Sequence, residues 1–209
     1  MIELMVQRSI ILLLMMVVIL TGCKDESGKP KIISSKDKVE MVRIPMISGY
    51  TKVGDPIYQD FYMDTIEVTV GQFKKFLKSS GYEPESPIDW AELYKYSPTD
   101  AHPMIYVSWL DATAYTKWAG KRLPTEAEWE FAARGGLVSK EFPWGDDESI
   151  ARDYANYKGT DGKDQWDETT APVGSFSPNG YGLYDMAGNV FELCSDWYDE
   201  DYYSNSPLR

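Results

Sequence analysis

Apolar and polar positions follow helical spacing in three segments between residues 69 and 136. In the first segment, "TVGQFKKFLKSSGY", four apolar residues fall on one face of a helix: Val70, Phe73, Phe76 and Leu77. Thr69 can cap the N-terminus of this helix, and Gly81 can end it. The pattern therefore predicts an amphipathic helix between these two residues.

The second and third segments carry capping boxes. In a capping box, the side chain of the residue before the helix accepts from a backbone N–H three residues later, and the side chain of that later residue accepts from the backbone N–H of the first. Ser108 and Asp111 form one box in "SWLDATAYTKWAGK". The apolar face predicted for that helix consists of Trp109, Ala112, Tyr115 and Ala119. Thr125 and Glu128 form the other box in "LPTEAEWEFAARGG". A glycine follows each segment, so both helices have a predicted start and end.

Short strands are expected before the first helix, and little regular structure after the third. "EMVRIP" (40–45) and "DFYMDTIEV" (60–68) are typical of strands. From Gly135 onward, Gly, Pro, Asn and Asp interrupt the chain every few residues. The sequence thus predicts one α+β domain, residues 40–209, whose second half consists mainly of loops.

Residues 1–22 predict a signal peptide. An apolar run at residues 10–20 follows Arg8 and is too short to cross a bilayer, which takes about 20 residues. The run ends in "LTGC", which resembles a bacterial lipobox whose cysteine, Cys23, carries acyl chains such as palmitate. Residues 23–39 are expected to form a polar, solvated tether. We therefore expect a lipoprotein anchored in the bacterial cell envelope, on the periplasmic or extracellular face of a membrane.

Charge and composition exclude several functional classes. The net charge of −12 disfavours nucleic-acid binding, because phosphate recognition needs a basic surface, and it suits cation binding or simple solubility. If Cys23 is acylated, Cys194 is the one remaining cysteine, so no intramolecular disulfide can form. His102 is the one histidine of the sequence, which leaves Cys/His zinc sites and His-based triads poorly supplied.

Four sequence blocks together resemble the formylglycine-generating enzyme (sulfatase-modifying factor) family. The blocks are "MDTIEVTVGQFKKF", "HPMIYVSWLDATAYTKWAGKRLPTEAEWEFAARGG", "FPWGDD" and "TAPVGSFSPNGYGLYDMAGNVFELCSDWY". They run in family order from about Met41 to the last residue. The resemblance implies an α+β, C-type-lectin-like fold with low regular secondary structure that calcium stabilises. It also implies a domain that is incomplete at its C-terminus, because the family's C-terminal block does not occur before Arg209.

The resemblance implies two calcium sites, which need oxygen ligands. The first would use Asn156, the carbonyl of Tyr157, Asp164 and the carbonyl of Trp166, with Asp167 as the alternative to Asp164 because the spacing departs by one residue. The second would use Asp185, the carbonyls of Gly188 and Val190, and Glu192. Six acids and no basic residue lie between residues 185 and 203, and a divalent cation would relieve their repulsion. The alternative is that these acids only form a solvated surface.

Cys194 is interpreted as a structural residue, with no catalytic residue assigned. In oxidase members of the family, a cysteine pair works with copper and oxygen to convert a cysteine within Cys-x-Pro-x-Arg to formylglycine, and that pair lies in the C-terminal block. Acids surround Cys194 in the sequence: Glu192, Asp196, Asp199 and Glu200. We expect them to raise the pKa of the thiol and suppress the thiolate.

These features favour a membrane-anchored, calcium-stabilised domain with a binding or structural role towards envelope proteins or a protein or peptide substrate. The alternative is a formylglycine-generating oxidase for sulfatases whose copper-binding cysteine pair lies in a segment missing from this sequence. An iron-dependent sulfoxide synthase, as in some relatives, is disfavoured because one histidine cannot supply a multi-histidine iron site.

Overall fold

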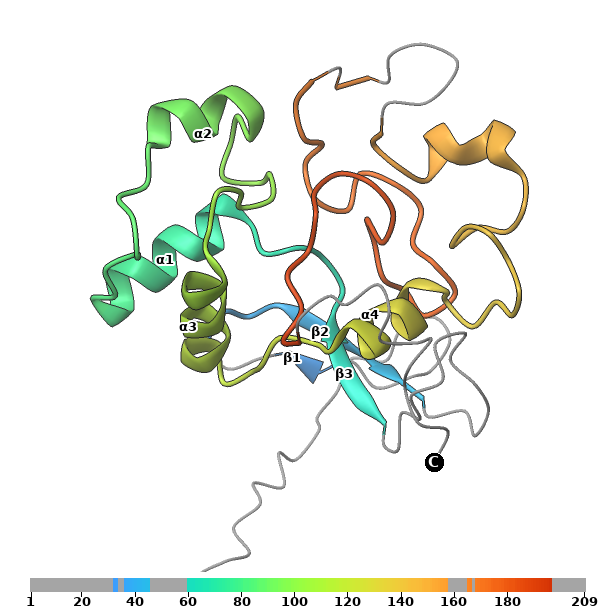
Figure 1. Ribbon diagram of the computed structural model, residues 1–209, viewed down its shortest axis with the longest axis horizontal. Coiled ribbons are helices and arrows are strands. Elements are labelled where there is room, and N and C mark those ends of the chain that lie inside the picture. The colour runs from blue at the N-terminus through green and yellow to red at the C-terminus, as the bar shows by residue number, and fades with distance from the viewer. Residues whose placement is uncertain (1–31, 34–35, 46–59, 158–164, 167, 197–209) are drawn as a thin grey trace, which may run out of the picture.

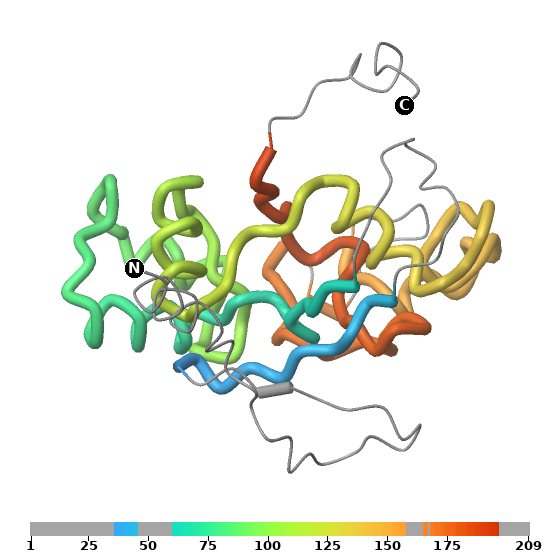
Figure 2. The backbone as a smooth tube through the Cα atoms, turned by 90° about the horizontal axis from the view of Figure 1, so that it is seen from below, coloured from blue at the N-terminus to red at the C-terminus, as the bar shows by residue number. Residues whose placement is uncertain are grey.

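The computed structural model describes residues 32–33, 36–45, 60–157, 165–166 and 168–196. Helices α1, α2 and α3 lie on one side, the loop-rich segment after residue 135 lies on the other, and a small sheet with helix α4 lies between them (Figures 1 and 2). Cys23, Asp164 and Asp167, which carry predictions made from the sequence, lie outside the described residues. No helix in the described ranges is long and apolar enough to cross a membrane.

The sheet is antiparallel and has the order β1 (Ile32–Ile33), β2 (Glu40–Ile44), β3 (Phe61–Asp64). It contains both strands predicted from the sequence, but β3 ends at Asp64 and not at residue 68. The reason is that the chain leaves the sheet here to enter α1. The Met104 amide donates to the Val68 carbonyl (2.8 Å), so Val68 pairs with the segment before α3 and not with β2.

Part of the segment expected to be a solvated tether is folded against the domain. Strand β1 pairs with β2, and both Asp37 and Val39 are buried. Lys121 Nζ donates to Asp37 Oδ2 and to Asp64 Oδ1, each at 2.6 Å. The Tyr115 hydroxyl also donates to Asp37 Oδ2, at 3.4 Å. For the described part of this segment the expectation is wrong, because Asp37 belongs to a buried ion network.

The three predicted helices are confirmed as α1 (Val70–Ser80), α3 (Trp109–Ala119) and α4 (Glu126–Ala133). Each begins with a complete capping box, at Thr69, Ser108 and Thr125. Two further elements were not predicted: α2 (Trp90–Tyr96), capped by Asp89, and a 3₁₀ helix, Glu148–Asp153. The loop-rich second half is confirmed, since this 3₁₀ helix is the one helix or strand described after α4.

Two apolar clusters form the core. The larger one joins α1, α2 and α3 through Val70, Phe73, Phe76, Leu93, Met104, Tyr115 and Ala119. The smaller one joins β2, α4 and the C-terminal loops through Ile44, Ala132, Ala133, Leu183 and Met186. Trp109 was predicted on the buried face of α3 but is 44% exposed, and its indole N–H donates to the Cys194 carbonyl (2.8 Å) on the C-terminal segment.

Candidate metal centre and binding groove

Two segments far apart in the sequence cross where the predicted metal residues lie. Asn156 and Gly188 form a parallel β-bridge, and the Asn189 amide donates to the Asn156 carbonyl (2.8 Å). Gly188 has a φ of 80°, and a Cβ at this position would lie 2.4 Å from the Asn156 carbonyl oxygen. Only glycine therefore allows this crossing.

The Asn189 side chain ties three segments together at the crossing. Its Oδ1 accepts from the Ala171 amide (2.8 Å) and from Asn156 Nδ2 (3.2 Å). Its Nδ2 donates to Oε2 of Glu67 (2.8 Å), a residue that follows β3 in the chain. Asp185 lies four residues before Asn189, and its Oδ2 accepts from the Gly174 amide (2.6 Å). The crossing thus brings Asp185 into one region with an acid from the first half of the chain.

That acid, Glu67, is a candidate site residue which the sequence reasoning missed. Burial raises its pKa to about 9, and the charges of Asp185 and Glu192 add to the effect. Its Oε1 is buried and has no hydrogen-bond partner among the described residues, and the same holds for Asp185 Oδ1. Burial also raises the pKa of Asp185. The signal in the sequence was an isolated acid in the strand-like run "TIEV".

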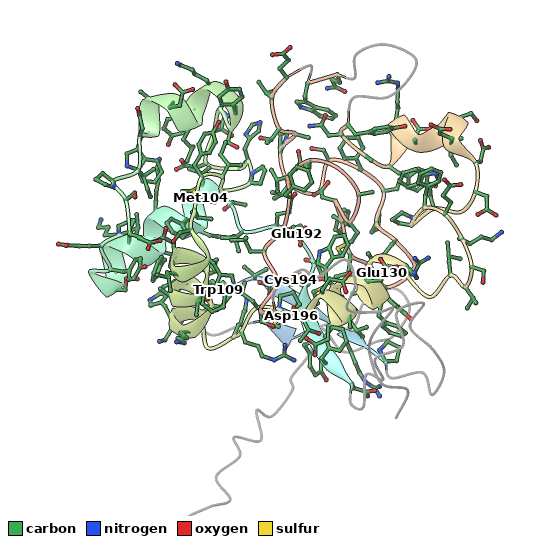
Figure 3. The ribbon with its side chains drawn as sticks, viewed as in Figure 1. Met104, Trp109, Glu130, Glu192, Cys194 and Asp196 are labelled. Carbon is green, nitrogen blue, oxygen red and sulfur yellow. The ribbon has the colours of Figure 1, made fainter. Side chains whose placement is uncertain are left out.

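Glu192 is the third carboxylate of this region. Its Oε2 accepts from the Trp129 indole N–H (2.8 Å). The residue as a whole is exposed to water, yet protein surrounds its carboxylate and raises its pKa to about 7, with the Asp185 charge adding to the rise. Figure 3 shows Glu192, Cys194 and Asp196 in succession along the segment that passes between α3 and α4.

The residues of the second predicted site fit a hard cation such as calcium. Buried carboxylate oxygens are normally paired, and a cation bound in this region would supply a partner for the unpartnered oxygens of Glu67 and Asp185. No three His, Cys, Asp or Glu side chains in the described ranges are gathered closely enough to hold a metal by themselves. A cation here would therefore need backbone oxygens as well, such as the carbonyls of Gly188 and Val190.

The first predicted site shows no such fit in the described residues. Asn156 Nδ2 donates to the Thr169 carbonyl (3.0 Å), so this side chain supports the loop crossing. The Trp166 carbonyl already accepts from the Thr169 amide (3.0 Å) and hydroxyl (2.8 Å). Tyr157 lines a groove that also contains Glu67 and Glu192. The carboxylate expected to complete this site, Asp164, lies outside the described residues.

A groove of about 1210 Å³ runs beside the candidate metal centre. Its walls come from β3, the C-terminal end of α2, one face of α3, and the segment after residue 183. Among the described residues, five acidic side chains line it: Asp64, Glu67, Glu128, Glu168 and Glu192. The two basic side chains that line it in the part of the chain that the structure describes, Lys121 and Arg122, are both in ion pairs with acids of the same chain. The groove is therefore acidic overall.

Cys194 does not have the surroundings of a reactive thiol. Its pKa is raised to about 12, first by burial and then by the charges of Asp196 and Glu192. Asp199 and Glu200, expected to contribute, lie outside the described residues. Copper(I) needs a pair of nearby thiolates, and Cys194 is the one cysteine in the part of the chain that the structure describes. The described residues therefore do not fit a copper site.

Comparison with known proteins decides the family. Residues 39–208 match the sulfatase-modifying factor enzyme 1-like domain. The chain belongs to this family. It is 49% identical over 112 residues to the formylglycine-generating enzyme of Streptomyces coelicolor, a match covering 51% of this chain and 36% of that protein. It is also 46% identical over 100 residues to the inactive C-alpha-formylglycine-generating enzyme 2 of Bos taurus, covering 46% of this chain and 33% of that protein.

A solved structure shows the same fold. PvdO from Pseudomonas aeruginosa aligns with a TM-score of 0.64 and 28% identity, covering 84% of this chain and 77% of the other. The predicted fold of the family, with mixed helices, few strands and little regular structure, is thereby confirmed. The chain spans about a third of the length of the two curated relatives. Family and fold alone do not assign the reaction.

Proposed function

We propose that this protein is a lipid-anchored protein of the bacterial cell envelope, whose family domain is stabilised by calcium and has a binding role. The observation that supports calcium is the pair of buried, unpartnered oxygens, Glu67 Oε1 and Asp185 Oδ1. Asp185, Glu192 and the carbonyls of Gly188 and Val190 would hold the ion, with Glu67 as an added ligand. The ion would neutralise carboxylates whose charges now raise one another's pKa.

The binding role is supported by the groove and by the lack of a copper-binding thiol pair in the described residues. A polypeptide from an envelope protein is the ligand class that we assign to the groove. The anchor would be acyl chains on Cys23, which would hold the domain on the periplasmic or extracellular face of a membrane. Replacing Cys23 by Ala should then move the protein from the membrane fraction to the soluble fraction, and an unchanged distribution would contradict the anchor.

The calcium proposal is tested by thermal unfolding with and without a chelator. A ligand at 100 times its Kd stabilises by about 2.7 kcal/mol, so chelation should lower the Tm by several degrees. Asp185→Asn and Glu192→Gln should remove this sensitivity. Glu168→Gln is the matched control, because Glu168 is an exposed groove acid outside the proposed ligand set. An equal chelator effect in all four proteins, or none in the unaltered protein, would refute the metal site.

A formylglycine-generating oxidase is the second candidate, and the 49% identity to such an enzyme favours it. Its copper-binding cysteine pair would have to lie in sequence beyond Arg209. The intact mass of the protein extracted from its native membranes distinguishes the two candidates. A mass near that of residues 23–209 plus acyl chains supports the binding role. A mass larger by roughly a hundred residues, together with conversion of a Cys-x-Pro-x-Arg peptide to formylglycine, would establish the oxidase.

A further inference from the structure

The groove follows the free edge of the sheet. All four residues of β3, from Phe61 to Asp64, line it. Alternate side chains of a strand point to opposite faces, so a cavity bordered by every residue of a strand runs along the strand's edge. Within the described residues, β3 is the last strand of the sheet and pairs with β2 alone. The unpaired edge of β3 therefore borders the groove.

The walls beyond this edge are apolar and aromatic at many points. Tyr96 and Tyr106 meet edge to face, with ring centroids 6.2 Å apart. Tyr106 is 64% exposed and has a φ of 59°, which is unusual for a residue with a side chain. Phe191, which also lines the groove, has a side chain that is fully exposed to solvent. Exposed aromatic groups along an open strand edge are typical of surfaces that bind another chain.

The charges of the groove indicate what kind of chain would bind. Lys121 and Arg122 are paired with acids, whereas the described residues supply no basic partner for Glu168 or Glu192. A second copy of this protein would bring another net charge of −12 to this surface. Residues 197–209 contain three acids and one basic residue, Arg209. Neither occupant complements an acidic groove.

We propose that the groove is a strand-addition site for an extended segment of a partner protein in which apolar and basic residues alternate. The segment pairs with the free edge of β3, places its apolar side chains against the aromatic walls and directs its basic side chains towards Glu168. Because β3 has four residues, main-chain pairing supplies only part of the affinity, and the walls supply the rest. The inference rests on the proposed binding role and names the mode of binding and the partner's chemistry.

The probe is the acetylated and amidated octapeptide KVTVKVTV, titrated into the full chain in detergent and calcium by isothermal calorimetry. We expect binding, and at least about tenfold weaker binding when alternate backbone amides are N-methylated, because the hydrogen bonds of strand pairing are lost. The peptide EVTVEVTV should not bind. Glu168→Gln should weaken binding severalfold, whereas Glu148→Gln, an exposed acid outside the groove, should leave it unchanged.

Other results overturn the proposal in distinguishable ways. Equal affinity of the N-methylated peptide removes strand addition and leaves a polypeptide-binding groove. Binding only after truncation at Asp196 shows that residues 197–209 occupy the groove. Sedimentation as a dimer that dissociates as the peptide binds shows that a second copy does so. Absence of binding in every form refutes this inference together with the binding role, while the calcium site is tested independently by thermal unfolding.

Discussion

The strongest stability prediction concerns the buried ion network at Lys121. Its side chain is 10% exposed, and its partners Asp37 and Asp64 are 1% and 19% exposed. Lys121→Met keeps most of the packing of the aliphatic chain but leaves two nearly buried carboxylates without their cation. Breaking a buried ion pair by removing one partner costs about 3–5 kcal/mol. We expect a loss of this size in the free energy of unfolding at pH 7.5.

Urea unfolding followed by tryptophan fluorescence measures this loss. Lys95→Met is the matched control, because Lys95 and Glu92 form a surface ion pair with side chains 65% and 43% exposed. That control should change stability by less than about 1 kcal/mol.

The loss should also depend on pH. Burial raises the pKa of Asp64 while Lys121 lowers it, so removing the lysine raises it further. Asp64 then binds a proton more readily in the folded variant than in the unfolded chain. The variant's free energy of unfolding therefore falls as pH rises from the pKa of Asp64 in the unfolded chain to its pKa in the folded variant. Lys121→Met should therefore cost less at pH 5 than at pH 7.5. A loss below about 1 kcal/mol, or an equal loss at both pH values, would refute the role given to this network.

Three further predictions concern single positions. Gly180→Ala should lower the free energy of unfolding in urea by more than about 2 kcal/mol, because its Cβ would lie 2.2 Å from the Gly135 carbonyl oxygen. Gly81 has a φ of 69° and open space around it, so Gly81→Ala should lower that free energy by about 1 kcal/mol. Cys194, with a pKa of about 12, should react with iodoacetamide at pH 8 roughly a thousandfold more slowly than a free cysteine, and complete labelling within minutes, followed by mass spectrometry, would contradict this. In chelator, the folded protein keeps Glu67 protonated up to a pKa of about 9, while the unfolded chain releases this proton near pH 4.5. The free energy of unfolding should therefore fall from pH 5 to pH 9, and Glu67→Gln should reduce this pH dependence.

How much of the fold could be predicted depended on how local its determinants are. The capping boxes at Ser108 and Thr125 lie within four residues of sequence, and both appear in the structure as complete boxes. Helix α2 was missed because its seven residues make only two turns, which is too short for a periodic pattern. Strand β1 has two residues and exists only through its pairing with β2, which local sequence cannot reveal.

The candidate site divides in the same way. Asp185 and Glu192 belong to one continuous block whose spacing could be read directly, and the structure places both in the electrostatic neighbourhood of Glu67. Glu67 itself lies 122 positions before Asn189, to which it is hydrogen-bonded, so no local pattern could reveal it. Asp37 was missed for another reason, because burial of a single acid within a polar stretch depends on Lys121, 84 positions away.

The proposed metal centre and the groove would be electrostatically coupled, because Glu67 and Glu192 belong to both. Glu67, with a pKa of about 9, is already uncharged at neutral pH without calcium, so calcium would remove the charge of Glu192 and leave Glu168 as the main attraction for a basic strand. Calcium would also fix the wall that carries Val190 and Phe191. Loss of negative charge would weaken the binding of a basic peptide, whereas a fixed wall would strengthen it. Only the loss of charge would change how the affinity depends on salt, because only it alters the charge that the peptide meets. The affinity of KVTVKVTV should therefore depend less on salt in calcium than in chelator, and equal slopes in the two buffers would show that the metal centre and the groove act independently.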